Sequence, residues 1–283
     1  MNRSARSKLA KETLALCKRG EYVAPSGGTV SIADDLDASL RETVLYIPDQ
    51  FAELLVPTLG EADTPSAFEV VNETTLSAAR RLAQEACLEG VACLNFASAK
   101  NPGGGFLSGS QAQEESLARS SGLYACISPV DGYYAANRSC GTALYTDHII
   151  YSPGVPVFRD DAGRLLDEPY LVSFISAPAV NTGAVRRSRP SEVPQVLPVM
   201  RRRAEYVLKV ALANGEQHLV LGAWGCGVFR NDPAEVARVF GDLLLGAGGY
   251  RDRFRTVVFA VLDRTDNGGI IKPFNDLFDN HTG

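Results

Sequence analysis

The chain has 283 residues, of which 45% are hydrophobic and 22% are charged, a balance typical of soluble globular proteins. Its formal net charge of −5 disfavours direct nucleic-acid binding, because such binding depends on a basic surface. No apolar run approaches the roughly 18 residues needed to span a bilayer, and the basic N-terminus lacks the apolar core of a secretory signal. We therefore expect a cytoplasmic protein with neither a nucleic-acid nor a membrane partner.

The cysteines and histidines give no sign of a metal site. None of the six cysteines forms a CxxC pair, and no two of the three histidines have the spacing of metal ligands. Thiols among apolar neighbours are typical of buried, reduced cysteines. We expect no metal and no cofactor.

The first sixth of the chain carries no recognisable chemistry. Its pattern predicts a helix over 4–19, an extended ribbon over 21–32, a helix from a cap at Asp34 or Asp35 to Leu40, and a strand over 43–48 that ends at Pro48. We expect residues 1–65 to form an accessory extension that packs on a main domain of residues 66–283.

A strand–helix–strand unit opens the main domain. An apolar strand over 68–71 is followed by Thr74 or Thr75 as a helix cap, and a buried strand follows over 91–96. Such a unit implies a parallel sheet that binds ligands at the carboxyl ends of its strands. The segments after the two strands, which begin at Asn72 and Asn95, should therefore lie on one edge.

The rest of the main domain alternates apolar runs with turns. We expect two extended pieces around a turn at 161–163, a buried strand over 170–180 closed by Pro178, an exposed connection over 183–198, a helix over 199–214, a strand, glycine loop and helix over 218–245, and a last strand over 255–263 before a short tail. A single elaborated α/β domain fits this order.

Two glycine loops follow two of these strands. The first contains Gly103, Gly104 and Gly105 and leads into a predicted helix with Glu114 and Glu115. A strand, glycine loop and helix can present backbone N–H groups to phosphate, and glycine lets a ligand approach the bare backbone. Two carboxylates would not serve phosphate binding alone, so they indicate catalysis.

The second glycine loop contains Gly225, Cys226 and Gly227. In a parallel sheet both loops can open on one edge and hold a diphosphate from two sides. Neither loop has the GxxxxGK[ST] pattern or a GxGxxG pattern with a later acidic residue, so P-loop and Rossmann enzymes lose their main support.

The motif as a whole resembles a known family. Three glycines, seven residues and then Gln113-Glu114-Glu115 resemble the signature of poly(ADP-ribose) glycohydrolases, and the segments at 72–85 and 222–232 resemble the bacterial type. The resemblance implies a macrodomain-like three-layer α/β/α sandwich with a mixed central sheet and an N-terminal helical extension. It also implies hydrolysis of the ribose–ribose O-glycosidic bonds of poly(ADP-ribose), on ADP-ribosylated proteins in the DNA damage response, to release ADP-ribose.

The resemblance also assigns roles to individual residues. Glu115 is the general acid and Glu114 orients the substrate. The expected substrate-binding residues are Glu73, Asn101, Gly103, Gly104, Gly105, Gln113, Gly225, Gly227, Val228, Phe229 and Asn231. Among these, Glu73 would bind the adenine amino group, Asn101 a ribose hydroxyl, and Phe229 would lie over the ribose nearest the cleaved bond.

The residues themselves are compatible with more than one interpretation. Adjacent helical residues point about 100° apart, so Glu114 and Glu115 cannot flank one bond as the paired carboxylates of most glycosidases do. One acid, an orienting partner and an oxocarbenium-like transition state fit better. Glu73 fits a favourable charge at a helix N-terminus equally well. The alternative functions are a non-catalytic ADP-ribose-binding macrodomain, which has no need of the glutamates, and a mono-ADP-ribosyl or acetyl-ADP-ribose hydrolase.

Overall fold

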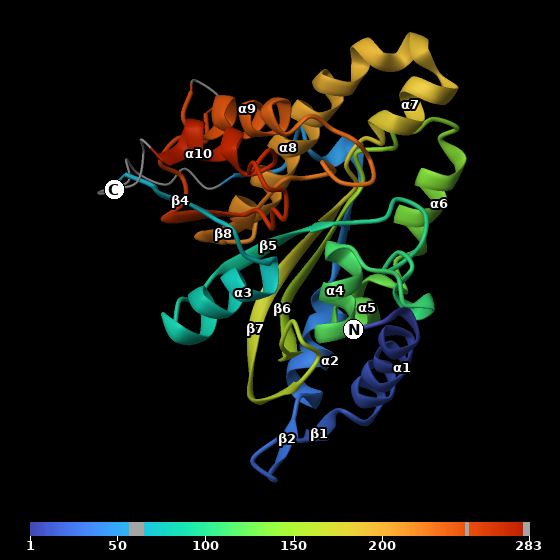
Figure 1. Ribbon diagram of the computed structural model, residues 1–283, viewed down its shortest axis with the longest axis vertical. Helices are drawn as coiled ribbons and strands as arrows, with labels where there is room; N and C mark the ends of the chain where they lie inside the picture. The colour runs from blue at the N-terminus through green and yellow to red at the C-terminus, as the bar shows by residue number, and fades with distance from the viewer. Residues whose placement is uncertain (57–64, 247–248, 280–283) are drawn as a thin grey trace.

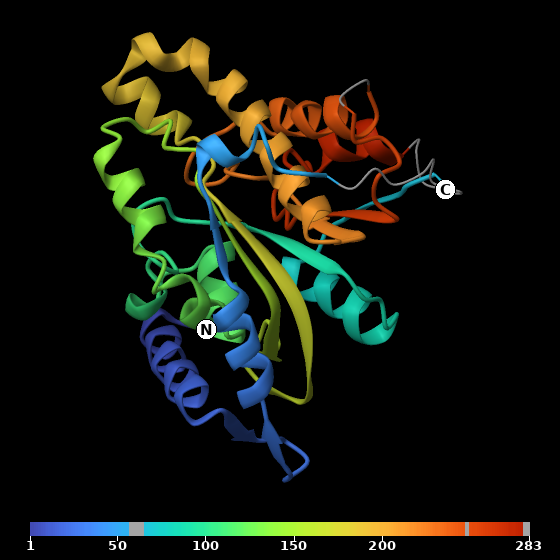
Figure 2. The ribbon, with the colours of Figure 1, turned by 180° about the vertical axis from the view of Figure 1, so that it is seen from behind.

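The computed structural model describes residues 1–56, 65–246 and 249–279 (Figure 1). Its centre is a seven-stranded mixed sheet of order β3-β6-β7-β5-β8-β9-β4. The strands are β3 (Val44–Tyr46), β4 (Ala67–Val71), β5 (Val91–Phe96), β6 (Ile149–Arg159), β7 (Leu165–Ala177), β8 (His218–Leu221) and β9 (Thr256–Ala260). Helices cover both faces of this sheet (Figures 1 and 2). The expected macrodomain-like α/β sandwich is confirmed.

Each face of the sheet has its own set of helices. One core lies under α8 (Val196–Ala213), α9 (Pro233–Leu244) and α10 (Lys272–Phe278). The other lies under α1 (Arg3–Arg19), α2 (Ala33–Glu42), α3 (Thr75–Arg80), α4 (Gln113–Ser120), α5 (Leu123–Ile127) and α6 (Asp131–Ser139). Short elements complete the chain: β1 (Glu21–Val23), β2 (Thr29–Ser31), η1 (Pro48–Gln50), η2 (Arg81–Glu85), η3 (Phe106–Ser108), α7 (Thr182–Ser188) and η4 (Pro190–Gln195).

Strand direction sets the position of the functional edge. Strands β7, β5, β8, β9 and β4 run parallel to one another, whereas β6 is antiparallel to β7 and β3 is antiparallel to β6. The carboxyl ends of five strands therefore meet on one edge, as predicted for the segments after β4 and β5. These two strands are not neighbours, however, because β8 and β9 lie between them.

Three predictions for local structure were wrong. Residues 183–198, expected as an exposed connection, are helical: Asn181 caps α7 by accepting from the backbone N–H of Ala184, and η4 and the first turn of α8 follow. The expected tail contains α10, where Phe278 stacks on Phe259 with ring centroids 4.2 Å apart. The cap of α2 is Ile32, and the two aspartates lie in its first turn instead. In the first two cases, tertiary packing stabilises short helices that the local sequence pattern does not predict.

The N-terminal segment contacts both the sheet and the first glycine loop. Strand β3 pairs with β6. Helix α1 holds the loop after the glycines: Arg3 Nε donates to Ser108 O (3.0 Å), Arg6 Nε to Gly109 O (2.8 Å) and Ser7 Oγ to Leu107 O (2.7 Å). The division at residue 65 remains a prediction, and residues 57–64 beside it lie outside the described part.

No helix in the described ranges combines the length and apolar character needed to cross a membrane. All six cysteines are free, and among them Cys93 and Cys126 are buried whereas Cys87 is exposed. The expectation of buried thiols therefore holds only for part of the set.

Candidate active site

A cavity of about 820 Å³ opens at the carboxyl edge of the parallel strands. Its walls come from the segments that follow β4, β5, β8 and β9, together with the first turn of α4. Eleven of the thirteen predicted site residues line it: Glu73, Asn101, Gly104, Gly105, Gln113, Glu114, Glu115, Gly225, Gly227, Val228 and Phe229. Gly103 and Asn231 do not.

The two glutamates of α4 accept hydrogen bonds from backbone N–H groups of the segment that follows β5 and contains the first glycine loop. We call it the first glycine segment. Glu115 Oε1 accepts from Gly105 N (3.0 Å), and Glu114 Oε2 accepts from Ser98 N (2.8 Å). Both side chains are nearly buried, with exposed fractions of 9% and 3%. Although they point in different directions on the helix, one loop fixes both carboxyl groups at the cavity wall.

Gly104 is required by this arrangement. It has φ +58°, and a Cβ there would lie 2.6 Å from Glu115 Oε1 and 3.1 Å from Glu114 Oε2. A side chain would therefore meet strain and the two carboxyl groups together. Gly103, with φ +63°, faces the protein instead, because a Cβ would lie 2.9 Å from the ring of Tyr124.

Burial changes the protonation of Glu114. Loss of water around the carboxyl group, with the nearby charge of Glu115, raises the pKa of Glu114 to about 8, although the hydrogen bond from Ser98 N opposes this. Oε1 of Glu114 has no hydrogen-bond partner, and neither has Oδ1 of the adjacent Asn95. The side-chain amide of Asn95 and the backbone N–H of Gly103 also lie near this carboxyl group and oppose the rise, but burial outweighs them. At neutral pH this residue is therefore mainly the uncharged acid.

Gln113 fastens the start of α4 to strand β5. Its Nε2 donates to Leu94 O (2.7 Å) and to Thr75 Oγ1 (3.1 Å), and its Oε1 accepts from Phe96 N (2.8 Å). The side-chain amide, expected to bind substrate, thus makes three hydrogen bonds within the protein. Its position fixes the helix that carries the glutamates.

The second glycine loop is braced from within. Gly225 has φ +76°, and a Cβ there would lie 2.3 Å from Asn231 Nδ2. Asn231 is buried, donates to Val180 O (3.0 Å) and accepts from the hydroxyl of Thr182. The side chain of Asn231 therefore holds the loop in place from behind the cavity.

The two loops differ in their free N–H groups. In the first, Gly104 N donates to Asn101 O (3.0 Å) and Gly105 N donates to Glu115. In the second, the N–H groups of Gly227, Val228 and Phe229 have no acceptor within the described part of the chain. A Cβ on Gly227 would meet nothing within 4 Å. The second loop is therefore the open cradle for an anion.

Phe229 lies at one end of the cavity. Its ring is half-buried beside Tyr145, with centroids 6.2 Å apart, and its carbonyl accepts from Gly183 N (2.9 Å). Asn101 is exposed at the rim, and its side-chain amide makes no hydrogen bond to any described residue. Both groups are thus available to a ligand.

Glu73 lines the cavity where β4 ends. Its Oε1 pairs with Arg81 Nη2 (2.9 Å), and its Oε2 accepts from Ser77 Oγ (2.9 Å). Each oxygen keeps a free lone pair, so both the helix-terminal role and a contact with a ligand amino group are compatible with this geometry. Apolar Leu262 and Ile270 line the same cavity.

Several polar residues of the wall were not predicted as site residues from the sequence, among them Ser98, Asp161 and Arg264. Asp161, at the tip of the β6–β7 hairpin, accepts from Thr74 Oγ1 (2.7 Å), and burial raises its pKa. It lies 87 residues from Thr74 in the sequence. No local pattern links the two, so only the sheet topology brings them together.

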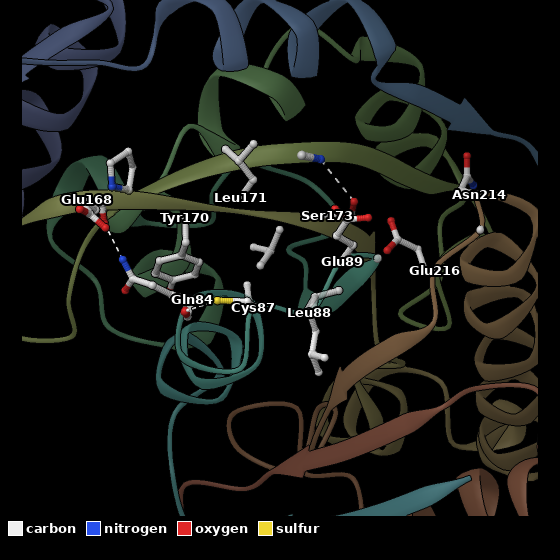
Figure 3. Close-up of a pocket in the computed structure, with 17 residues that line it drawn as sticks. Gln84, Cys87, Leu88, Glu89, Glu168, Tyr170, Leu171, Ser173, Asn214 and Glu216 are labelled. Atoms are coloured by element: carbon white, nitrogen blue, oxygen red, sulfur yellow. Dashed lines mark hydrogen bonds between the residues drawn. The ribbon is translucent and has the colours of Figure 1, made fainter. Parts of the chain in front are cut away.

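A second hollow of about 580 Å³ lies at the opposite edge, near the amino ends of β5 and β8 (Figure 3). Its floor includes Ser173 and Glu216, and the hydroxyl of Tyr151 donates to Glu216 Oε1 (2.5 Å). Burial raises the pKa of Glu216. None of the predicted site residues lines this hollow. Across the described residues, no group of three or more His, Cys, Asp or Glu is placed to hold a metal ion.

Comparisons with known proteins agree on one family. The family model "Microbial-type PARG, catalytic domain", in which PARG stands for poly(ADP-ribose) glycohydrolase, matches residues 10–160. The crystal structure of the enzyme from Thermomonospora curvata is similar at 51% identity and a TM-score of 0.93, covering 98% of this chain and 100% of that one. No curated protein sequence matches.

Two similar structures contain ligands. The Thermomonospora curvata enzyme bound to the inhibitor ADP-HPD is 51% identical with a TM-score of 0.90, covering 97% of this chain and 99% of that one. The Deinococcus radiodurans enzyme in complex with ADP-ribose is 52% identical with a TM-score of 0.80, covering 87% of this chain and 97% of that one.

Proposed function

Because the chain belongs to the microbial-type poly(ADP-ribose) glycohydrolases, we propose that its larger cavity binds one ADP-ribose unit of the polymer and presents it to Glu115. The protein is a glycosidase that hydrolyses poly(ADP-ribose).

Binding begins at the second glycine loop. The diphosphate lies on the free N–H groups of Gly227, Val228 and Phe229, which form a concave anion site without a charged side chain. The adenine lies toward Glu73, with Leu262 and Ile270 against its faces. The ring of Phe229 then covers the ribose that carries the scissile bond, and Asn101 donates to a ribose hydroxyl.

Glu115 serves as the general acid. It gives its proton to the 2′-oxygen as the bond between this oxygen and the anomeric carbon breaks, leaving an oxocarbenium-like ribose that the nearby diphosphate stabilises. Water adds to the anomeric carbon and returns a proton to Glu115. Glu114, uncharged at neutral pH, orients the ribose through a hydrogen bond.

One observation carries this assignment: both carboxyl groups are fastened to the first glycine segment and still face the cavity. A module that only binds ADP-ribose needs the second loop but has no use for two buried carboxyl groups. The geometry therefore favours a hydrolase over a macrodomain that binds ADP-ribose without cleaving it.

The test is Glu115→Gln, which keeps the acceptor for Gly105 N but cannot donate the proton. Polymer hydrolysis, followed by chromatography of released ADP-ribose, should fall by about 10²- to 10⁴-fold. Calorimetric ADP-ribose affinity should stay within a few fold. Glu235→Gln, an exposed glutamate in the first turn of α9, is the matched control. Near-wild-type turnover in Glu115→Gln would require a different acid.

The same proposal extends to the setting of the reaction. The polymer is carried by ADP-ribosylated proteins of the DNA damage response, and the enzyme meets it in the cytoplasm without binding nucleic acid or membrane directly. The acidic composition supports the absence of direct nucleic-acid binding. Hydrolysis of polymer on an auto-modified acceptor protein, compared with free polymer, tests it.

A further inference from the structure

Exposed cations from four segments lie outside the cavity wall, on segments that contact the two glycine loops. They are Lys100, Arg138, Arg186, Arg187, Arg189 and Arg230, and we call them the exit patch. The chain as a whole carries a formal charge of −5. A basic patch on an acidic protein is therefore a local feature, placed beside the mouth of the active site.

The first half of the exit patch is joined to the second glycine loop. Gly183 N donates to Phe229 O (2.9 Å), and a Cβ on Gly183 would lie 3.2 Å from Arg230 Cδ. Helix α7 thus begins against the loop that holds Phe229. Arg186 and Arg187 follow in the last turn of this helix.

The second half is joined to the first glycine loop. Arg138 Nε donates to Lys100 O (2.9 Å), and Lys100 directly precedes the rim residue Asn101. At the end of α6, a Cβ on Gly141 would lie 4.0 Å from Arg189 Nη2. In Figures 1 and 2, α6 lies below α7. The patch is therefore continuous from one loop to the other.

Little of this positive charge is neutralised. Arg189 pairs with Glu192 (3.2 Å), and Arg138 lies over the ring of Tyr134, 5.9 Å from its centroid. Among the ion pairs of the described residues, none involves Arg186, Arg187 or Arg230. Exposed, unpaired arginines recognise phosphate well because their planar guanidinium groups form paired hydrogen bonds.

We propose that the exit patch binds the diphosphate of the next polymer unit, on the side that leaves when the bond is cut. This inference rests on the proposed function, in which Phe229 covers the ribose of the scissile bond. The chain beyond that ribose must pass the Phe229 end of the cavity. Every ADP-ribose unit carries a diphosphate, and free ADP-ribose has no next unit. The patch therefore increases the affinity of the enzyme for polymer but not for free ADP-ribose.

The double variant Arg186→Gln/Arg187→Gln tests the inference. Its matched control is Lys18→Gln/Arg19→Gln, an exposed basic pair in the last turn of α1. For wild type, kcat/KM on long polymer should fall as salt rises. In the arginine variant it should be about 5- to 10-fold lower at low salt, and the log–log salt slope should be shallower by about 1. ADP-ribose affinity by calorimetry should not change.

The outcomes separate this inference from the proposed function. An unchanged salt slope, an equal loss in the control, or a parallel loss of ADP-ribose affinity would each overturn the exit patch as a polymer site. Homopolymeric RNA at equal phosphate concentration should compete only weakly, and equal competition would make the patch a general polyanion surface. If wild type failed to cut polymer, the proposed function itself would fail.

Discussion

Replacing Glu114 with glutamine should stabilise the fold at neutral pH, although the residue lies in the active site. The pKa of Glu114 is about 8 in the folded chain, above its ordinary value of 4.5. Folding therefore favours the protonated form. The stability that Glu114 contributes is fully present below about pH 4.5 and is lost as the pH rises toward 8.

The structure sets the size of this effect. Linkage between the two pKa values gives a loss of roughly 2 to 3 kcal/mol between pH 5 and pH 7. Solvent screening does not reduce it much, because the residue is 3% exposed. Glutamine can still accept from Ser98 N, and its amide places a donor where Glu114 Oε1 has no partner. The variant should therefore fit without a new unsatisfied group.

Urea denaturation at several pH values between 5 and 8 measures this directly. The free energy of unfolding of Glu114→Gln should decline less than that of wild type over this range, so that the difference grows with pH. Glu235→Gln should follow wild type, and the contribution of buried Glu216 cancels because all three proteins share it. Parallel curves for wild type and Glu114→Gln would show that Glu114 is already ionised in the folded chain.

Two further substitutions test the aromatic wall of the site and a buried ion pair outside the cavity. Phe229→Ala should lower kcat on polymer much more than ADP-ribose affinity, because misorientation costs rate before binding; global unfolding of the variant would instead make the ring a core residue. Asp147→Asn should cost about 3 to 5 kcal/mol in urea denaturation, because it removes the carboxylate that pairs with the fully buried Arg203 at 2.9 Å. Glu205→Gln on the same helix is the control, and an equally small change in both would mean that the carbonyls of Leu144 and Pro178 satisfy Arg203.

Sequence patterns predicted those parts of the fold whose residues carry the signal locally. Strand β5 is an unbroken apolar run and is almost wholly buried at the centre of the sheet. Thr74 caps α3 by accepting from Ser77 N, and Pro233 lies in the first turn of α9. The strand and the two helix starts depend on side chains within a few residues of each other. Periodicity and helix-cap chemistry are therefore sufficient to predict them.

The missed elements depend on partners far away in the chain. Helix α10 has seven residues and is held by the packing of Phe274 and Phe278 against the sheet. Helix α7 also has seven residues and buries Val185. Such short segments are marginal helices alone. Likewise, nothing near Asp161 shows that a hairpin tip closes over the helix cap at Thr74.

The site shows a further limit of sequence patterns, because a glycine loop does not reveal which N–H groups remain free. The first loop has already given the N–H of Gly105 to a carboxyl group, whereas the N–H of Gly227 remains open. This division has a steric reason. The space in front of Gly104 is already occupied by the two carboxyl groups, because a Cβ there would lie 2.6 Å from Glu115 Oε1 and 3.1 Å from Glu114 Oε2. With the anion on the second loop, the glutamates can approach the scissile bond while α1 holds their loop at Ser108 and Gly109.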